Sequence, residues 1–228
     1  MNDDVCVIIP IYNEGKVITR TLRGVLKQFP FVVCVNDGSK DNTVEAVSKT
    51  SAHLISHFTN MGQGAAIQTG IEYGLQYPDI EYFITFDADG QHRVEDALAM
   101  LAYLREHPKT DIVLGSRFLG KTQSIPLIRR ILLRLAIWFE NATTGAHLTD
   151  AHNGLRVFNR KVATQLNIIM PDMAHASEII HRIIEKKFKY HEFPVTIVYS
   201  DYSKAKGQSM ANAINISFDI LLQEIIRK

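Results

Sequence analysis

Residues 82–92 read YFITFDADGQH, an apolar run of aromatic and β-branched residues that ends in two aspartates one residue apart. Such a run is typical of a buried strand. Side chains alternate along an extended chain, so Asp87 and Asp89 lie on the same side and can point at one object. Two carboxylates that close repel each other unless a cation lies between them or one stays protonated. The pattern fits either an acidic turn before a helix or a divalent metal site with Gln91 as a third oxygen ligand.

Strand and helix patterns alternate on both sides of this stretch, which predicts an α/β fold with a mostly parallel sheet and right-handed crossovers. The first half is regular, and the second half has an apolar, basic segment and a Thr/Gly-rich loop within 120–150. The expected strands are 5–10, 31–35, 53–57, 82–86, 111–118, 154–158 and 193–199, and the expected helices are 14–28, 41–49, 63–77, 94–106, 160–167, 175–187 and 209–227.

Composition places the chain among ordinary globular proteins, with 228 residues, 46% hydrophobic residues and a formal charge of +1. The small net charge gives no reason to expect a nucleic-acid partner. We expect one domain over 1–208, in two parts (1–118 and 119–208), followed by an apolar helix over 209–228. The N-terminus has no signal-peptide pattern and no window is apolar enough for a membrane span. These features predict a cytoplasmic protein that touches a membrane surface.

Polar clusters follow three of the expected strands, where parallel sheets bind their ligands. Residues 10–14 (PIYNE) follow the first strand, 36–39 (NDGS) the second and the aspartate pair the fourth. Asp37 can accept hydrogen bonds from a base or a ribose, although this stretch also reads as a turn and helix cap. Gly62 and Gly64 open a helix whose N-terminus favours an anion. The first turn has neither a dinucleotide-binding G-x-G-x-x-G nor a P-loop, which excludes those two classes.

Five motifs in order carry a specific resemblance: P-x-Y-N-E at 10–14, N-D-G-S-x-D-x-T at 36–43, N-x-G-x-G-x-A at 60–66, D-A-D-G-Q-H at 87–92 and G-S-R-F at 115–118. Together they resemble the family 2 glycosyltransferases, and D-x-x-x-G-x-R-x-F at 150–158 continues the match. The chain looks most like the branch of dolichol-phosphate mannose synthase and the polyprenyl-phosphate glycosyltransferases. The resemblance implies a GT-A fold, a mixed, mostly parallel sheet flanked by helices, a nucleotide-sugar donor, and Mg²⁺ or Mn²⁺ as cofactor.

The resemblance further implies that residues 1–208 form a single GT-A catalytic domain with a donor-nucleotide half (1–118) and an acceptor half (119–208). It also implies roles for individual residues on the donor side. Asp37 would contact the nucleotide base, with Gly64 at the nucleotide sugar and Pro10, Tyr12 and Glu14 lining the pocket. Asp87 would serve the ribose or the metal, and Asp89 and Gln91 would hold the metal against the diphosphate. A lysine commonly stands in this family where the chain has Gln63.

Basic residues mark the expected acceptor side. The segment 125–139 (IPLIRRILLRLAIWF) reads either as a core helix or as an interfacial helix with Arg129 and Arg130 on phosphates. Arg117 is the strongest candidate for a direct phosphate contact, because a guanidinium grips phosphate oxygens bidentately. Arg156 is a second candidate, or a partner in a salt bridge. Lys204 and Lys206 can approach the diphosphate, or lie in a solvated loop.

The acceptor decides whether the reaction needs a general base. A polyprenyl phosphate is already an anion, whereas a sugar hydroxyl must lose a proton to a base such as Asp150 or Glu178. Both acids also have structural readings, Asp150 as a cap or ion-pair partner and Glu178 as a first-turn acid. The histidines at 92, 147, 152, 175 and 181 do not have zinc-site spacing.

The sequence therefore predicts an inverting, metal-dependent glycosyltransferase with Asp89, Arg117, Asp150 and Glu178 as candidate catalytic residues. The preferred acceptor is a polyprenyl phosphate, and the donor is a UDP-, GDP- or dTDP-sugar. One alternative acceptor is a sugar hydroxyl on a surface polysaccharide or lipid-linked glycan. Another reading is a catalytically silent nucleotide-sugar-binding scaffold that forms a homodimer or binds a membrane partner through the terminal helix.

Overall fold

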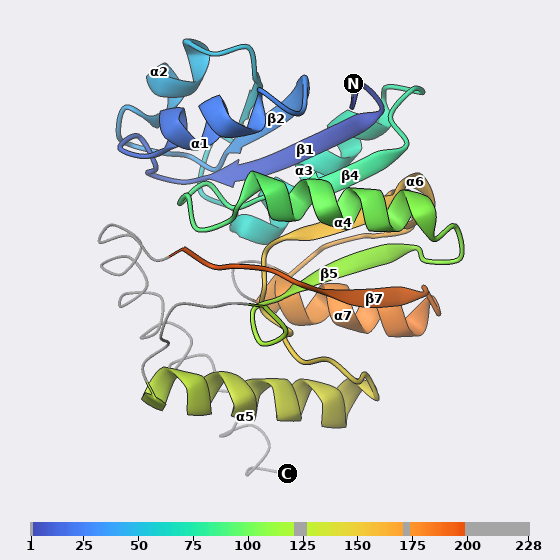
Figure 1. Ribbon diagram of the computed structural model, residues 1–228. Helices are drawn as coiled ribbons and strands as arrows, with labels where there is room; N and C mark the ends of the chain where they lie inside the picture. Colours follow the sequence, from blue (N-terminus) through green and yellow to red (C-terminus); the bar gives the residue numbers. More distant parts are fainter. Residues whose placement is uncertain (1, 121–126, 171–173, 199–228) are drawn as a thin grey trace. The chain divides into compact units, whose positions relative to one another are not determined.

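Seven strands form one mixed sheet in the computed structural model, which describes residues 2–120, 127–170 and 174–198 (Figure 1). The strands are β1 (Val5–Ile11), β2 (Phe31–Asn36), β3 (His53–Ser56), β4 (Tyr82–Thr85), β5 (Ile112–Ser116), β6 (Arg156–Asn159) and β7 (Tyr190–Pro194). The helices are α1 (Ile18–Val25), α2 (Thr43–Ser48), α3 (Gln63–Leu75), α4 (Val94–Glu106), α5 (Leu127–Thr144), α6 (Arg160–Ala163) and α7 (Ala174–Glu185). The helix expected over 209–228 lies outside the described residues.

The strand order is β3-β2-β1-β4-β6-β5-β7, and every neighbouring pair is parallel except those that involve β6. Strand β6 runs antiparallel to both β4 and β5, so it inserts a reversed strand into an otherwise parallel sheet. The predicted mixed, mostly parallel sheet is therefore confirmed. Because β6 is reversed, the segment that precedes it arrives at the edge where the parallel strands end.

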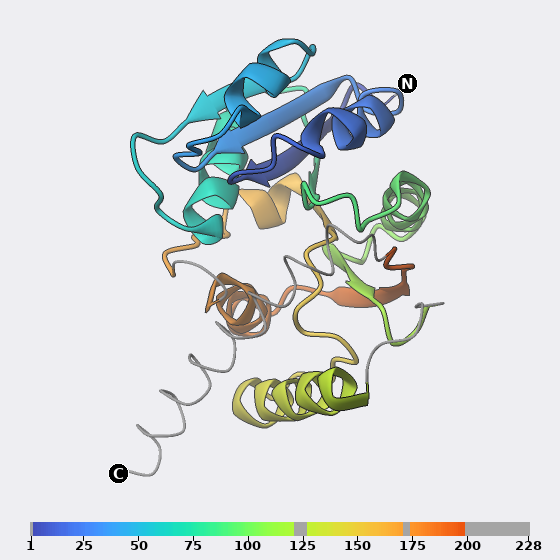
Figure 2. The same ribbon diagram turned by 90° about the vertical axis from the view of Figure 1, so that its left-hand side faces the viewer.

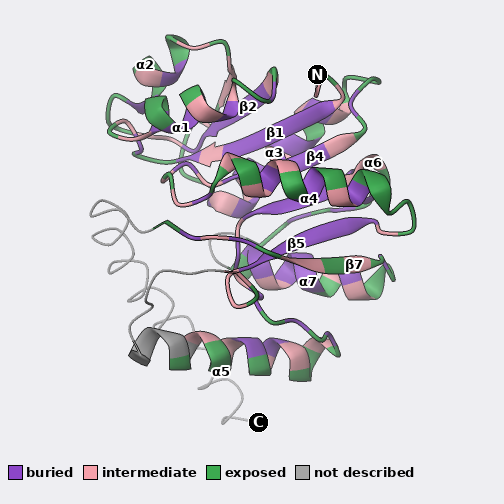
Figure 3. Ribbon diagram, viewed as in Figure 1, coloured by how far each residue is buried: buried purple, intermediate pink, exposed green. Residues whose placement is uncertain are grey.

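Helices cover both faces of the sheet, with α1, α2 and α4 on one face and α3 and α7 on the other (Figures 1 and 2). Strand β1 is apolar throughout because both of its faces are buried, as Figure 3 shows. Cys6 and Ile8 pack into the cluster beneath α3, while the alternating residues turn to the other face. On α1, the buried residues recur at helical spacing: Ile18, Thr21, Leu22 and Val25.

The last expected strand, 193–199, is wrong. Strand β7 pairs with β5 three residues earlier, from Tyr190, and ends at Pro194, which has no N–H to donate. Val195 and Ile197 are buried as their apolar character suggested. The Val195 N–H still donates to the Ser116 carbonyl at the end of β5, but the Thr196 N–H donates to Asp96 on α4 and the Val198 N–H to the Gln91 carbonyl, so the chain leaves the sheet there. The expected helix at 160–167 ends early, at Ala163, and the basic apolar segment forms α5.

Asp111 ties three elements together where β5 begins. Its carboxylate accepts hydrogen bonds from the Lys189 backbone N–H (2.8 Å) and from Lys161 Nζ (2.9 Å). Burial alone would raise the pKa of the Asp111 carboxyl, but these bonds and one from Asn159 outweigh it and lower the pKa. The ionised carboxylate therefore stabilises the folded state above the ordinary aspartate pKa, and this contribution is lost as the pH falls through the lowered value.

We expect Asp111→Asn to lower the free energy of unfolding by about 1–2 kcal/mol at neutral pH, because a charged acceptor of two hydrogen bonds becomes a neutral one. Urea unfolding of both proteins across a pH series measures this difference. The difference should shrink steadily as the pH is lowered below the ordinary aspartate pKa. Asp3→Asn, at an exposed position, is the control and should change little. A difference between wild type and Asp111→Asn that does not vary with pH would contradict the assignment.

Candidate active site

The carboxyl ends of the parallel strands bring the sequence motifs to one edge of the sheet, which faces the viewer in Figure 2. Tyr12 and Glu14 follow β1, Asp37 follows β2, the aspartate pair follows β4 and Arg117 follows β5. The segment 150–154 reaches the same edge because β6 is reversed. Residues from both halves of the chain therefore meet there.

The loops after β1 and β2 are joined by hydrogen bonds. Asn13 has a left-handed backbone (φ 54°), donates its N–H to Ser39 Oγ (2.9 Å) and accepts from the Lys40 N–H (2.9 Å). The Glu14 N–H donates to Thr43 Oγ1 (2.8 Å), and the Glu14 side chain is buried. The Tyr12 side chain is exposed, and Pro10 is half-buried within β1. Among the predicted pocket residues, Tyr12 is therefore the one most open to a ligand.

Asp37 is buried and fixes the loop between β3 and α3. Its Oδ1 atom lies 2.8 Å from His57 Nδ1 and accepts from the Met61 N–H (2.8 Å), and its Oδ2 atom accepts from the Gly62 N–H (2.8 Å). Each carboxylate oxygen has two acceptor positions, so one position on Oδ2 is left for a ligand. The structure thus gives Asp37 a structural task beside the base contact that the sequence predicts.

Asp87 is held on two sides. Its Oδ2 atom lies 2.8 Å from His92 Nε2, and its Oδ1 atom accepts from Gln63 Nε2 (3.1 Å). Burial alone would raise the pKa of the Asp87 carboxyl, but His92, Arg156 and His175 outweigh it and lower the pKa. His92 is almost fully buried, whereas the Asp87 side chain keeps 30% of its surface exposed. Asp87 is therefore a fixed, ionised carboxylate with access from outside.

Asp89 and Gln91 lie next to each other. The Gln91 backbone N–H donates to Asp89 Oδ1 (3.0 Å), and the Gln91 side-chain amide lies 2.5 Å from Asp89 Oδ2. Burial and the neighbouring charge of Asp87 raise the pKa of the Asp89 carboxyl. Thr21 Oγ1 on α1 donates to the Ala88 carbonyl (2.9 Å) and so fixes the backbone between the two aspartates.

These residues fit a divalent metal ion. Burial is the main cause that raises the pKa of the Asp89 carboxyl, and the charge of the ionised Asp87 raises it further, so the two carboxylates repel each other. A cation between them would relieve that repulsion. No group of three or more His, Cys, Asp or Glu side chains suited to a metal occurs in 2–120, 127–170 or 174–198. Two carboxylates and an amide match a site that is completed by water and substrate phosphates, as Mg²⁺ sites commonly are.

Gly154 lies directly against the Asp87 carboxylate. A Cβ atom at residue 154 would lie 2.3 Å from Asp87 Oδ2 and 2.6 Å from Oδ1, closer than any real contact. The carboxylate has little freedom to move away because Gln63 and His92 hold it. The glycine in the segment before β6 therefore makes room for the aspartate that follows β4.

We expect Gly154→Ala to reduce catalytic activity by about a hundredfold, because a displacement of about 1 Å in a catalytic group commonly has an effect of that size. Steady-state sugar transfer and thermal unfolding of the same variant measure the effect. Gly24→Ala is the matched control, because its Cβ would make an ordinary contact of 3.6 Å with Val94. This control should retain activity and gain a little stability from the better helix propensity. Equal activity in both variants would contradict the role given to Gly154.

Arg117 and Asp150 form a buried ion pair. The Arg117 Nε atom lies 2.6 Å from Asp150 Oδ2, and the Arg117 backbone N–H donates to the same oxygen (3.0 Å). Arg117 Nη2 also donates to the His152 carbonyl (3.1 Å). Glu192 on β7 supports this arrangement, because its carboxylate accepts from the backbone N–H groups of Thr149 (2.8 Å) and Asp150 (3.0 Å). The segment before β6 thus fixes the position of the Arg117 guanidinium, and Glu192 on β7 holds that segment in place.

Arg156 is the first residue of β6 and is buried. Its Nη1 atom has no hydrogen-bond partner among the described residues. Burial lowers the pKa of the Arg156 guanidinium to about 10 against the opposing charges of Asp87 and Asp150, so it remains protonated at neutral pH. A buried cation with an unused donor is costly unless a ligand completes its bonding.

Glu178 and Gly64 lie together beside the N-terminus of α3. Glu178 Oε2 accepts from the backbone N–H groups of Ile169 (2.9 Å) and Met170 (2.7 Å). A Cβ atom at Gly64 would lie 2.3 Å from the Met170 carbonyl oxygen, so the close approach that this glycine permits is to protein backbone. The structure therefore gives both predicted residues a part in positioning the segment before α7.

Helix α5 is not buried on all sides, contrary to the core-helix reading. Ile131, Leu135 and Trp138 recur at i, i+4 and i+7 and are exposed, whereas Glu140 is buried and accepts from Ser177 Oγ (2.7 Å) on α7. The backbone of Arg129 and Arg130 lies in α5, but their side chains, like Lys204 and Lys206, lie outside the described part of the chain. None of the helices within the described residues has the length and apolar character needed to cross a bilayer.

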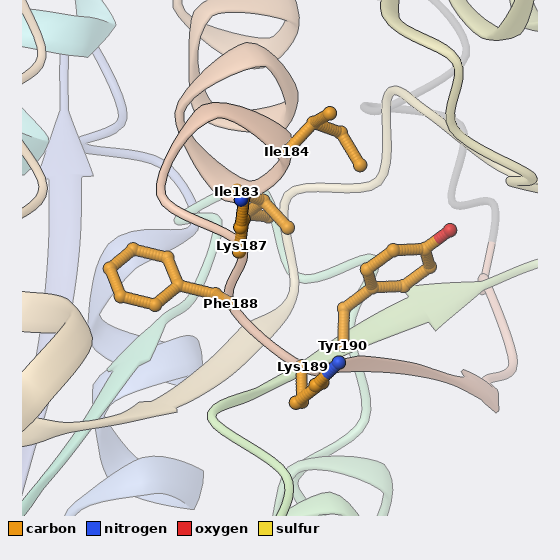
Figure 4. A pocket seen from close by; sticks show the side chains of 6 residues that line it. All are labelled: Ile183, Ile184, Lys187, Phe188, Lys189 and Tyr190. Carbon is orange, nitrogen blue, oxygen red and sulfur yellow. The ribbon is translucent and has the colours of Figure 1, made fainter.

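A hollow of about 320 Å³ lies at the opposite edge, where α7 ends and β7 begins. Figure 4 shows that Phe188 and Tyr190 point away from each other on its two sides. Its polar lining consists of Lys187, Lys189 and the tyrosine, with no acid. This hollow is therefore separate from the edge that carries the aspartates.

Three residues of the candidate site received no role from the sequence. His92 stood within the D-A-D-G-Q-H motif, and its position five residues after Asp87 was the available signal. Gln63 was noted only because it replaces a lysine. Gly154 gave no local signal, because its task depends on the contact between β4 and the segment before β6.

Known proteins resemble this chain in sequence and in fold. The model of Glycosyl transferase family 2 matches residues 6–166. An uncharacterized protein of Methanocaldococcus jannaschii is 32% identical, over 98% of this chain and 93% of its own length. The UDP-N-acetylglucosamine–dolichyl-phosphate N-acetylglucosaminyltransferase of Methanococcus voltae is 27% identical, over 95% of this chain and 94% of its own. Glucosyl-3-phosphoglycerate synthase of Mycobacterium tuberculosis, solved with Mn²⁺, UDP and glucosyl-3-phosphoglycerate, superposes with a TM-score of 0.63 at 13% identity, over 87% of this chain and 72% of its own.

Proposed function

The chain belongs to glycosyl transferase family 2, and we propose that it moves a sugar from a uridine-diphosphate donor to a polyprenyl phosphate at a membrane surface. Its GT-A fold and its nature as a glycosyltransferase are the predictions that the comparisons confirm. The donor, the metal and the acceptor are the proposed parts. Uridine is favoured over guanosine and thymidine because the Methanococcus voltae relative is named for a UDP-sugar and the mycobacterial synthase was solved with UDP.

On the donor side, Asp87, Asp89 and Gln91 would hold Mg²⁺ or Mn²⁺. When bound, the metal ion neutralises the charge that grows on the diphosphate as the sugar–phosphate bond breaks. His92 and Gln63 keep the Asp87 carboxylate in place, and Thr21 fixes the backbone between the aspartates. Tyr12 and the remaining acceptor position of Asp37 lie at the neighbouring strand ends, where a base and ribose would bind.

The proposal of a phosphate acceptor is supported above all by the hydrogen bonds that already engage Asp150 and Glu178, the two candidate general bases. Both Asp150 oxygens accept hydrogen bonds, one from Arg117 and one from the His152 N–H (3.3 Å). Glu178 holds the backbone of Ile169 and Met170. Acids engaged in this way are poorly placed to take a proton from a hydroxyl. A phosphate acceptor needs no base, because its oxygen already carries the negative charge that attacks the anomeric carbon.

Two guanidinium groups would receive the acceptor phosphate. Arg117 is held in place by Asp150, and Arg156 has an unused Nη1 donor. Charge-assisted bonds from guanidinium to phosphate are among the stronger hydrogen bonds in proteins. Attack from the side opposite the leaving diphosphate would invert the anomeric centre in one step. Arg129, Arg130, Lys204 and Lys206 remain predicted phosphate contacts.

Helix α5 would contribute to peripheral membrane contact. Its exposed Ile131, Leu135 and Trp138 form an apolar stripe, and Arg134 on the same outer side is also exposed. An amphipathic helix with cationic residues and a tryptophan is typical of helices that lie in the membrane interface. This arrangement would hold the enzyme where a polyprenyl phosphate is available, at the cytoplasmic face.

The test compares acceptors at one donor site. UDP with Mn²⁺ should raise the melting temperature, and EDTA should abolish the shift, because a ligand that binds only the folded state stabilises it. Labelled UDP-N-acetylglucosamine and UDP-glucose are then incubated with a polyprenyl phosphate or with the matching polyprenol, which has a hydroxyl instead. We expect transfer to the phosphate alone. Transfer to the polyprenol or to a glycan hydroxyl would favour the alternative acceptor class, and donor binding without transfer to any acceptor would favour the silent scaffold.

A further inference from the structure

Four large apolar side chains are exposed on two adjacent loops at the N-terminus of α3. Phe58 is fully exposed and Met61 is 56% exposed on the loop that precedes α3, and Ile169 (70%) and Met170 (50%) lie on the loop that precedes α7. The second loop packs against the first turn of α3, because the absence of a side chain at Gly64 allows the Met170 carbonyl to approach the helix. We call Phe58, Met61, Ile169 and Met170 the apolar rim.

Buried carboxylates hold both loops of the apolar rim from beneath. Asp37, 3% exposed, accepts the N–H groups of Met61 and Gly62, and Glu178, 7% exposed, accepts those of Ile169 and Met170. Gln68 Oε1 on α3 adds a bond from the Ile168 N–H (3.0 Å). Each carboxylate thus satisfies two successive backbone donors, so the loops are fixed while their apolar side chains point outward.

The stretches of chain that carry the apolar rim contain no charged residue, and the Asp37 and Glu178 carboxylates that hold them are buried. Residues 58–71 and 162–170 contain no Asp, Glu, Lys or Arg. Exposed loops are ordinarily polar, and an exposed apolar cluster on uncharged stretches of chain fits the boundary between lipid headgroups and acyl chains. A second copy of the chain is a poorer fit, because four side chains expose far less than the ~800 Å² per partner that a stable interface buries.

We propose that the apolar rim inserts into the membrane interface and turns the carboxyl edge of the sheet toward the bilayer. The inference rests on the proposed function, because a polyprenyl phosphate presents its phosphate at the level of the lipid headgroups. The apolar rim and the α5 stripe are then two separate contacts with one membrane. The apolar rim acts through apolar burial alone, whereas α5 also carries arginines.

The test uses the full chain and vesicles of phosphatidylcholine, with and without phosphatidylglycerol. We expect Phe58→Ser and Ile169→Ser each to lower the partition coefficient by about tenfold, as loss of one large buried apolar side chain implies. The factor should be the same for both lipid mixtures and at high salt, because the apolar rim carries no charge. Val44→Ser on α2, where the valine is also exposed, is the control and should bind like wild type. The double variant combines Phe58→Ser and Ile169→Ser. If its partition coefficient equals that of wild type, the proposal is overturned.

Further measurements distinguish loss of membrane contact from damage to the donor site and from failure of the proposed function. In the double variant, the UDP and Mn²⁺ melting shift and transfer to a short, water-soluble polyprenyl phosphate should equal those of wild type. Transfer to the same acceptor embedded in vesicles should fall with the partition coefficient. Loss of the melting shift would mean a damaged site and would overturn the assignment of these side chains to membrane contact alone. If no polyprenyl phosphate is a substrate, the proposed function fails, while the partition measurement still decides whether the apolar rim binds lipid. A wild-type dimer in solution that the double variant abolishes would assign the rim to a second copy instead.

Discussion

Asp89→Asn is expected to lower kcat/KM for sugar transfer by at least about a thousandfold, because it removes the charge that would hold the metal against the diphosphate. The same substitution should leave the melting temperature unchanged or raise it. Burial and Asp87 already raise the pKa of the Asp89 carboxyl, so a neutral amide at this position relieves repulsion in the folded state. Initial rates at saturating Mn²⁺, with thermal unfolding of the same protein, measure both effects.

The control for this experiment is Asp79→Asn, which alters an exposed aspartate before β4. It should leave both rate and stability unchanged. Titration with Mn²⁺ in the presence of UDP adds a direct measurement of metal affinity, which should be much weaker for Asp89→Asn. If Asp89→Asn transfers sugar within tenfold of wild type, Asp89 is not a metal ligand in the reaction.

The second large effect is expected at Arg117, where Arg117→Ala should lower kcat/KM by a hundredfold to a thousandfold. The variant loses a guanidinium that would bind phosphate charge. Removal of one such stabilising donor commonly lowers the rate by about a hundredfold to a thousandfold. Arg117→Lys retains the charge but not the planar fork, so it should restore part of the activity and raise KM for the acceptor. Rates measured against separate donor and acceptor titrations distinguish the two substrates.

Arg117 also stabilises the fold, so stability must be measured beside the rates. Arg117→Ala leaves Asp150 buried without its ion-pair partner, which should destabilise the protein, and Asp150→Asn in the same chain should recover part of that loss. Activity should remain low in the double variant. Arg105→Lys is the control, because Arg105 forms an ion pair with Asp4 at the other edge of the sheet. Full activity of the double variant would show that Arg117 acts only by holding Asp150.

The sequence predicted most of what depends on local pattern. The apolar run of β1, the helical spacing of α1 and the turn after β4 each follow from a few consecutive residues. Asp87, Asp89 and Gln91 were found together because they are neighbours in the chain, and Arg117 because it follows a strand. Those parts of the candidate site needed no knowledge of which strands pair.

The features that the sequence did not predict depend on which strands pair and on which groups form hydrogen bonds with each side chain. The run GLRVF predicts a strand but does not say whether it lies parallel or antiparallel to its neighbours. The contact between Gly154 and Asp87 could therefore not be predicted. The segment 193–199 looked like a strand because most of its residues are apolar, yet beyond Val195 its backbone N–H groups bond to Asp96 and to the Gln91 carbonyl instead of a neighbouring strand. The apolar stripe of α5 has the same spacing whether a helix meets a core or a membrane. Asp37 was predicted to contact a nucleotide base and Glu178 to act as a general base, and only the structure reveals the backbone donors that both satisfy.

The reversed strand β6 has a consequence for how the chain folds during synthesis. When the ribosome has made only the first 120 residues, β4 is an edge strand with unpaired backbone groups, because its partner β6 has yet to appear. Exposed edges of apolar strands invite association between nascent chains. Charged residues beside an exposed strand disfavour such association, and Asp87 and Asp89 follow β4 closely. Pairing of β6 with β4 and the placement of Gly154 against Asp87 both require the same segment, so the edge is closed and the surroundings of Asp87 are completed together.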